Sequence, residues 1–209
     1  MFDPTTTITF LAASIAIILA PGPAQALVLA RTLADGRKAG VLTAIGLNVG
    51  TLVHAVAAAL GLSAVLATSA TAFTFVKIIG AVYLVYLGIQ ALRTKDHSGD
   101  PAIAAPTGPW QMFGRAVMTG VLNPKVAIFF LAFLPQFVDP GRGPVFLQFL
   151  ILGSTLALID VLYEIALVLV AGAVRQRLTQ SVRFMRWRQR ITGVVLIGLG
   201  LRLGFTERH

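Results

Sequence analysis

Six long apolar stretches restrict the fold of this chain more than any other feature. They cover residues 6–30, 39–67, 73–92, 113–134, 145–173 and 191–205. A membrane-spanning helix needs roughly 20 apolar residues to cross about 30 Å of hydrocarbon. With 56% hydrophobic residues in 209, the chain also has more apolar side chain than one soluble core of this length could bury. The sequence therefore predicts an all-α membrane protein with six transmembrane helices, of which the last is the shortest.

The basic residues lie mainly between the apolar stretches. The formal net charge is +9, but only 12% of the residues are charged. Twelve Lys and Arg residues flank the first, third and fifth loops and three lie on the opposite side, so the positive-inside rule predicts cytoplasmic odd loops and periplasmic termini. We interpret the charge as a signal of topology and of contact with the lipid bilayer, with no nucleic-acid partner. The absence of cysteine excludes disulfides and thiolate metal sites.

The first apolar stretch shares one feature with secretory signal peptides, because Ala24-Gln25-Ala26 resembles an A-x-A cleavage site. A signal peptide also carries positive charge ahead of its apolar region, whereas Asp3 is the only charged residue there. The stretch is long enough to span the bilayer. We therefore interpret it as the first transmembrane helix.

A polar segment at residues 94–109 divides the spans into three and three. We interpret it as a cytoplasmic linker inside one transmembrane transporter domain, residues 1–209, between repeat one at 1–93 and repeat two at 110–209. Three spans in each half make the halves enter the membrane in opposite directions, as an inverted repeat requires. Short matches at offsets of 103, 113 and 112 residues agree: Pro21 with Pro124, Gly80 with Gly193, and Leu87-Gly88 with Leu199-Gly200.

Two prolines interrupt the first predicted span, and one interrupts the fourth at the matching place. Pro21, Gly22 and Pro23 lie inside the first span, and Asn123 and Pro124 inside the fourth. Proline lacks an N–H and clashes with the preceding turn, so each helix must kink or break. The alternative is a pair of packing kinks, but paired interruptions in two halves indicate the substrate site of a transporter.

Several polar side chains lie within predicted spans. Lys125 is expensive to place in hydrocarbon, at about 2.5–3.5 kcal/mol, and needs a partner or water. Asp160 and Glu164 project from one face of the fifth span, so we expect them to share a proton or to be neutralised by Lys125. The alternative is a structural salt bridge. Gln25 and Asn48 could hydrogen-bond a substrate or a neighbouring helix.

A stripe of small residues runs along the second span. Gly46, Gly50, His54 and Ala58 recur every four residues, which predicts close helix packing. The stripe could pack within one subunit or between the two subunits of a homodimer. His54 could relay protons, because imidazole titrates near neutral pH, or simply pack at a helix contact.

These motifs together resemble the lysine exporter family, including its homoserine/threonine efflux branch. They follow one another along nearly the whole chain: Pro21-Gly22-Pro23, Gly46 through His54, Lys77-x-x-Gly80-Ala81-x-Tyr83-Leu84-x-x-Leu87-Gly88, Asn123-Pro124-Lys125 and Phe133-Leu134-Pro135-Gln136-Phe137. The resemblance implies a secondary transporter of a bacterial inner membrane that expels amino acids or close derivatives, driven by the proton gradient. It implies neither enzyme activity nor a cofactor. Asp160 is similar to the acidic position of the family's fifth helix, whereas Glu164 lies outside the family's general pattern.

We therefore expect proton-coupled efflux of a zwitterionic amino acid by alternating access. The helix breaks would present N–H groups to the substrate carboxylate with Lys125 nearby. Asp160, with Glu164, would bind the amine and the coupling proton in turn.

Two other functions fit parts of the pattern. A metal-cation exporter of the same architecture would need convergent ligands, for which Asp160, Glu164 and His54 are the candidates. An intramembrane enzyme would need a nucleophile with a base, or metal ligands at fixed spacing. Neither H-E-x-x-H nor G-x-S-x-G occurs in the sequence, which disfavours the enzyme.

Overall fold

A computed structural model of the chain describes residues 2–20, 22–68 and 108–173, together with single positions at 75, 78, 82, 85, 86, 89, 194, 197 and 201. Every regular element in this part of the chain is helical, as predicted. The linker up to residue 107, Pro21 and most of the third and sixth predicted spans lie outside the described residues. The described residues contain two helices that could cross a membrane, or up to four if each of two bent pairs is one span.

The first predicted span consists of two helices, α1 (Pro4–Leu19) and α2 (Pro23–Asp35). Asp3 caps α1 by accepting a 2.8 Å hydrogen bond from the backbone N–H of Thr6. The axes of the two helices differ by 56°. The predicted break is therefore present, and Pro23 begins the second piece at the helix start where proline costs least.

The second and fifth predicted spans are the continuous helices α3 (Arg37–Thr68) and α7 (Val145–Ala173). The predicted bounds of 145–173 agree with α7, and those of 39–67 with α3 to within two residues at the start and one at the end. Both helices are long and apolar enough to cross a membrane. They pack against each other along their lengths, with Gly153 of α7 against Ala55 of α3.

The fourth predicted span is also broken. Helix α5 (Pro109–Val121) ends before Asn123, and the chain turns by 41°. After the break come α6 (Pro124–Ile128), the π-helical turn η1 (Phe129–Phe133) and the 3₁₀ turn η2 (Leu134–Phe137). A further 3₁₀ turn, η3 (Pro140–Arg142), leads into α7. The sequence predicted the break but not the π-helical turn.

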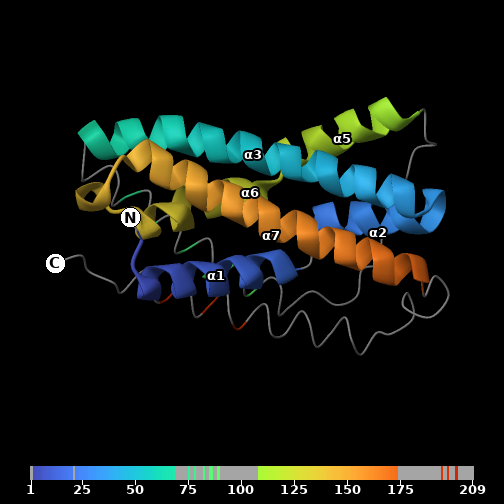
Figure 1. The fold of residues 1–209 in the computed structure, drawn as a ribbon, viewed down its shortest axis with the longest axis horizontal. Coiled ribbons are helices and arrows are strands. Elements are labelled where there is room, and N and C mark those ends of the chain that lie inside the picture. The colour runs from blue at the N-terminus through green and yellow to red at the C-terminus, as the bar shows by residue number, and fades with distance from the viewer. Residues whose placement is uncertain are drawn as a thin grey trace.

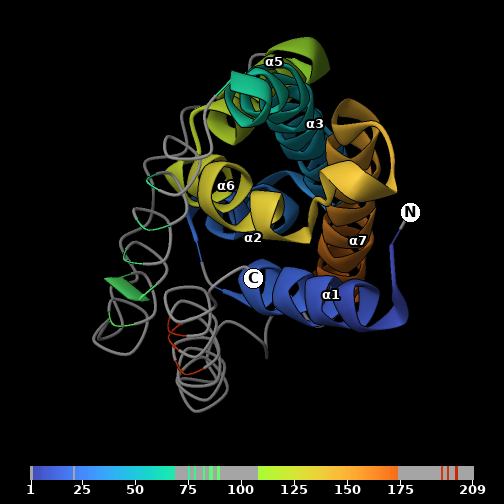
Figure 2. The ribbon, with the colours of Figure 1, turned by 90° about the vertical axis from the view of Figure 1, so that its left-hand side faces the viewer.

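The short helices after the two breaks lie in line beside α1, α3 and α7. Figure 1 shows α6 and α2 following one another along the long axis, and Figure 2, viewed along that axis, shows α6 in front of α2 with α1, α3 and α7 around them. Because α2 starts at Pro23 and α6 at Pro124, the two helices start near the middle of the molecule and run towards opposite ends.

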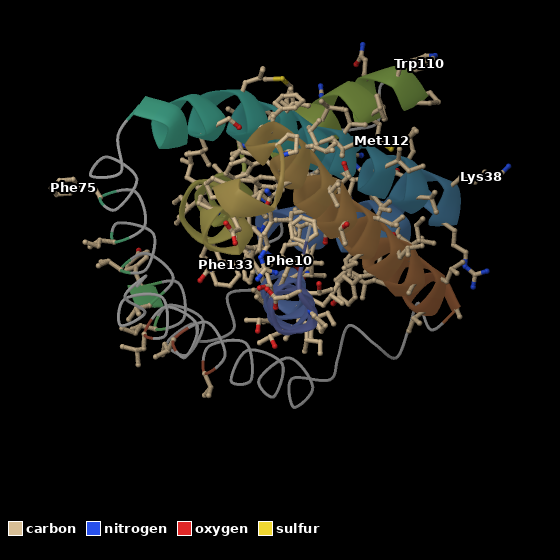
Figure 3. All side chains as sticks on the ribbon, turned by 60° about the vertical axis from the view of Figure 1, so that its left-hand side comes forward. Phe10, Lys38, Phe75, Trp110, Met112 and Phe133 are labelled. Atoms are coloured by element: carbon tan, nitrogen blue, oxygen red, sulfur yellow. The ribbon has the colours of Figure 1, made fainter. Side chains whose placement is uncertain are left out.

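The two ends of the molecule differ in the residues that they carry. The turn between α2 and α3, the start of α5 and the end of α7 lie at one end (Figure 1), where Lys38 and Trp110 project outwards (Figure 3). At the other end, Arg142 of η3 forms a 3.2 Å ion pair with Asp3. The N-terminal segment and the loop before α7 therefore lie on the same side, as the predicted topology requires.

An aromatic cluster fills the interior at the end that carries Asp3. Phe133 lies 5.0 Å from both Phe129 and Phe137 between ring centroids, and Phe137 lies 5.3 Å from Phe10 of α1. Figure 3 shows Phe10 and Phe133 inside the bundle. All four rings are almost fully buried, so the segment after the second break is held against α1.

The predicted small-residue stripe packs within the subunit. A Cβ added at Gly50 of α3 would lie 2.6 Å from the backbone carbon of Gly120 on α5. A Cβ added at Gly46 would lie 2.8 Å from the Cβ of Ala116. The first half of the chain therefore contacts the second through backbone at this point, and this face of α3 is not open to a second subunit.

Candidate functional site

The two helix breaks meet at Lys125. Its Nζ atom donates hydrogen bonds of 2.9 Å to the carbonyl oxygens of Ile17 and Ala20, at the end of α1. A Cβ added at Gly22, the residue before α2, would lie 3.7 Å from the same Nζ. Lys125 lies in the first turn of α6, so one side chain joins the break of the first half to the break of the second.

Three helix ends surround this ammonium. The last carbonyls of a helix carry partial negative charge and its first N–H groups carry partial positive charge. The end of α1 therefore attracts the ammonium, whereas the starts of α2 and α6 are positive. Asn123 caps α6 by accepting a 3.1 Å hydrogen bond from the backbone N–H of Lys125. Gly22, at the start of α2, has no side chain with which to cap.

Gln25 lies in the first turn of α2 and is almost fully buried. Its Nε2 atom donates a hydrogen bond to the carbonyl oxygen of Ile18. Its Oε1 atom is buried without a hydrogen-bond partner among the described residues. A buried acceptor of this kind costs roughly 1–3 kcal/mol, so its presence beside the break favours a ligand that donates a hydrogen bond.

A second polar contact joins α3 to α7. Asn48 donates hydrogen bonds of 3.1 Å from Nδ2 to Glu164 Oε2 and to the carbonyl oxygen of Ala44. Glu164 is 1% exposed and Asn48 is 5% exposed. The Asn48 Oδ1 atom has no partner within the described part of the chain. Asp160 lies one turn away on the same face of α7 and is half-buried.

Lys125 and the two carboxyl groups share one electrostatic environment. The charge of Lys125 acts on Asp160 and on Glu164, and the charge of Asp160 acts on Glu164. The hydrogen bonds seen from Lys125 nevertheless go to carbonyls of α1. Ion pairs between other residues join Arg31 to Asp35 and Arg142 to Asp3 and Asp139.

His54 lies apart from this group. It is half-buried and stacks on Phe130 with ring centroids 6.0 Å apart. It is six residues from Asn48, or about 9 Å along α3 at 1.5 Å per residue. Across residues 2–20, 22–68 and 108–173 there is no group of three or more His, Asp or Glu side chains that could hold a metal ion, so the three predicted metal candidates do not form a site there.

The structure thus places predicted polar residues in two contacts, Lys125 and Gln25 at the end of α1 and Asn48 with Glu164 between α3 and α7, and it adds details that the sequence did not indicate. The contacts of Lys125 with α1 were not predicted, nor was the bond between Asn48 and Glu164. Arg31, which contributes to the predicted cytoplasmic charge, is buried within α2 beside Asp35. An i to i+4 pairing of Arg with Asp in the sequence is the signal that could have revealed that ion pair.

Known proteins resemble this chain over most of its length. The family model described as LysE type translocator matches residues 15–207. An uncharacterized membrane protein of Bacillus subtilis, YrhP, is 33% identical over 199 residues, which cover 91% of this chain and 94% of that protein. An uncharacterized membrane protein of Vibrio cholerae is 32% identical, covering 94% and 95%.

A third relative carries a functional name. The leucine efflux protein of Salmonella choleraesuis is 29% identical over 196 residues, which cover 93% of this chain and 92% of that protein. No solved structure is similar enough to count as a match.

Proposed function

The chain belongs to the LysE type translocator family, and from this premise we propose that it is a secondary transporter that exports an amino acid in exchange for protons. The family and the leucine efflux relative make the chain a membrane-spanning efflux protein. The amino-acid substrate, the proton coupling and the location in a bacterial inner membrane are parts of the proposal. The name of that relative suggests leucine or a similar apolar amino acid as the first substrate to test.

One observation carries the proposal: the two broken helices meet at Lys125, and helix α7, which packs against α1 and α2, carries Asp160 and Glu164 on one face. A zwitterion needs a positive environment for its carboxylate and acceptors for its ammonium. The start of α2 supplies the first, because unpaired N–H groups at a helix start favour anions and no side chain caps this helix. Pro23 and Pro124 occupy the first position of each half-helix, and Gly22 leaves the start of α2 without a side chain.

Acceptors for the ammonium lie on α7 and on its neighbours. Asp160 and Glu164 supply carboxylate oxygens, and Asn48 Oδ1 and Gln25 Oε1 are buried acceptors without partners among the described residues. The ammonium group of the substrate and a proton would occupy the carboxyl pair in turn, so that one proton enters the cell as each substrate molecule leaves it. Alternating access would follow from rocking of the two inverted halves around this point.

Purified protein in liposomes tests this function. We expect an imposed pH gradient to drive accumulation of radiolabelled leucine, and we expect Asp160→Asn to abolish the dependence on the gradient. Lys38→Gln, which removes an exposed charge far from the site, is the control and should behave like the wild type. Transport that is indifferent to the pH gradient would contradict proton coupling, and no movement of any amino acid would contradict the substrate class.

A further inference from the structure

We propose that Lys125 is a positioning residue whose ammonium serves as a tethered cation at the broken end of α1, rather than as a ligand of the substrate. This inference rests on the proposed function, because it assigns a role within the same site. The sequence placed Lys125 beside the substrate carboxylate. Two hydrogen bonds of Nζ lead to a different assignment, since they hold the ammonium at the carbonyls of Ile17 and Ala20.

A helix that ends inside a membrane needs a positive group at its last carbonyls. These carbonyls carry the negative end of the helix dipole and lack most of the partners they would have within a helix; among the backbone groups of this end, the Ile17 carbonyl accepts from the capping N–H of Ala20 at 3.2 Å. In transporters with broken helices, such half-helix ends coordinate coupling ions. Here the ammonium of Lys125 lies 2.9 Å from two of these oxygens and takes the place that a bound cation would take.

The residues before Lys125 direct it to this place. Asn123 caps α6 and Pro124 begins it, so Lys125 extends from the first turn of α6, beside the break. The start of α2 borders the same ammonium, because a Cβ added at Gly22 would make ordinary contact with Nζ at 3.7 Å. The cation thereby holds the end of α1 against the start of α6 and leaves the uncapped start of α2 to attract the substrate carboxylate.

The absence of cysteine from the chain allows a direct test by chemical restoration of the cation. Lys125→Cys is purified and treated with 2-bromoethylamine, in which the thiolate displaces bromide and leaves an aminoethyl thioether as long as lysine. The rate of leucine transport by the untreated variant should be lower than that of wild type by a factor of about ten or more, as expected for the loss of two charge-assisted hydrogen bonds. Alkylation should restore most of the rate, whereas iodoacetamide, which adds a neutral group, should not.

A competition experiment separates positioning from substrate binding. Leucine and leucinamide differ in the carboxylate, so a carboxylate ligand would distinguish them. If Lys125 only positions the helices, both compounds should lose affinity by the same factor in Lys125→Cys, and their ratio should stay as in wild type. If Lys125 binds the carboxylate, leucine should lose affinity while leucinamide does not, and that selective loss would overturn the inference.

The controls keep the outcomes distinct. Lys38→Cys, treated in the same way, should show no change in rate. If Lys125→Cys is not monodisperse in size-exclusion chromatography, Lys125→Met, which keeps most of the side-chain length and removes the cation, replaces it in the competition experiment with the same two outcomes. Failure of wild-type protein to move leucine or other amino acids would contradict the proposed function, whereas active wild type with no restoration by 2-bromoethylamine would contradict the role of Lys125 alone.

Discussion

Asn48 of α3 donates a 3.1 Å hydrogen bond to Glu164 of α7, so the more buried of the two carboxyl groups in the site is held by a neutral amide. This bond links one helix of the first half of the chain to one helix of the second. Glu164 therefore has two properties that a substitution can test separately: it accepts a hydrogen bond, and it can carry a charge.

Glu164→Gln should keep the first property and remove the second. The amide oxygen can still accept from Asn48, so we expect the melting temperature of the detergent-solubilised protein to stay within a few degrees of wild type. Proton-driven leucine uptake should fall by more than tenfold, because the variant cannot exchange a proton. Asn48→Ala is the matched comparison and should lower the free energy of unfolding by about 1–3 kcal/mol. Unchanged proton-driven uptake in Glu164→Gln would rule out a coupling role.

His54 should act through packing rather than as a proton relay. Its ring stacks on Phe130 and lies about 9 Å along α3 from Asn48. His54→Phe should therefore keep proton-driven uptake within about twofold, whereas His54→Ala should destabilise the protein by roughly 0.5–1.5 kcal/mol through loss of the aromatic pair. Thermal unfolding and uptake measured in parallel check this. A relay role would be supported instead if His54→Phe folded normally but lost its response to the pH gradient.

Gly50 should tolerate no side chain, because a Cβ there would lie 2.6 Å from the backbone of Gly120. Gly50→Ala should lower the free energy of unfolding by about 1–3 kcal/mol, as overpacking does, and the melting temperature by about 2–4 °C per kcal/mol. Gly61→Ala, on the same helix with nothing within 4 Å of an added Cβ, is the control and should be neutral or slightly stabilising. Equal melting temperatures for the two variants would show that α3 and α5 do not pack so closely.

The melting temperature of the protein should depend on the protonation of Asp3, which lies at the end of the molecule that carries η3. The backbone N–H of Thr6, followed by the Thr6 hydroxyl and then by Arg142, lowers the pKa of Asp3 below its ordinary value of 3.8. A lowered pKa in the folded state stabilises the protein above the unfolded pKa, and this stabilisation is lost as pH falls through the folded value. The melting temperature of Asp3→Asn should therefore lie below wild type near neutral pH, and the difference should shrink below about pH 4. A difference that stayed constant with pH would contradict this linkage.

The two ends of the molecule should face opposite sides of the membrane. Because the chain has no cysteine, Gly141→Cys and Lys38→Cys each introduce one reactive thiol, at opposite ends and at exposed positions. The charge distribution predicts that an impermeant maleimide labels Gly141→Cys in intact cells and labels Lys38→Cys only after permeabilisation. The reverse pattern would invert the predicted orientation.

The sequence alone determined the features that arise from neighbouring residues. Runs of apolar residues defined α3 and α7, with the bounds of α7 predicted to the residue, because a continuous helix in lipid depends on length and hydropathy. The breaks before Pro23 and Pro124 followed from the missing N–H and the fixed backbone of proline. The small-residue stripe of α3 also followed from spacing, although its partner did not.

Which residues meet across the bundle depends on the packing of the helices. Lys125 contacts Ile17 more than a hundred residues away, and Asn48 contacts Glu164 at a separation of 116 residues. Helical periodicity places a side chain on a face, but it does not determine which face of another helix lies opposite. That choice depends on close approaches such as the one between Gly50 and Gly120, and through them on the packing of the whole bundle. The sequence therefore indicated the polar residues of the site, and the packing of the helices decided that Lys125 faces the end of α1.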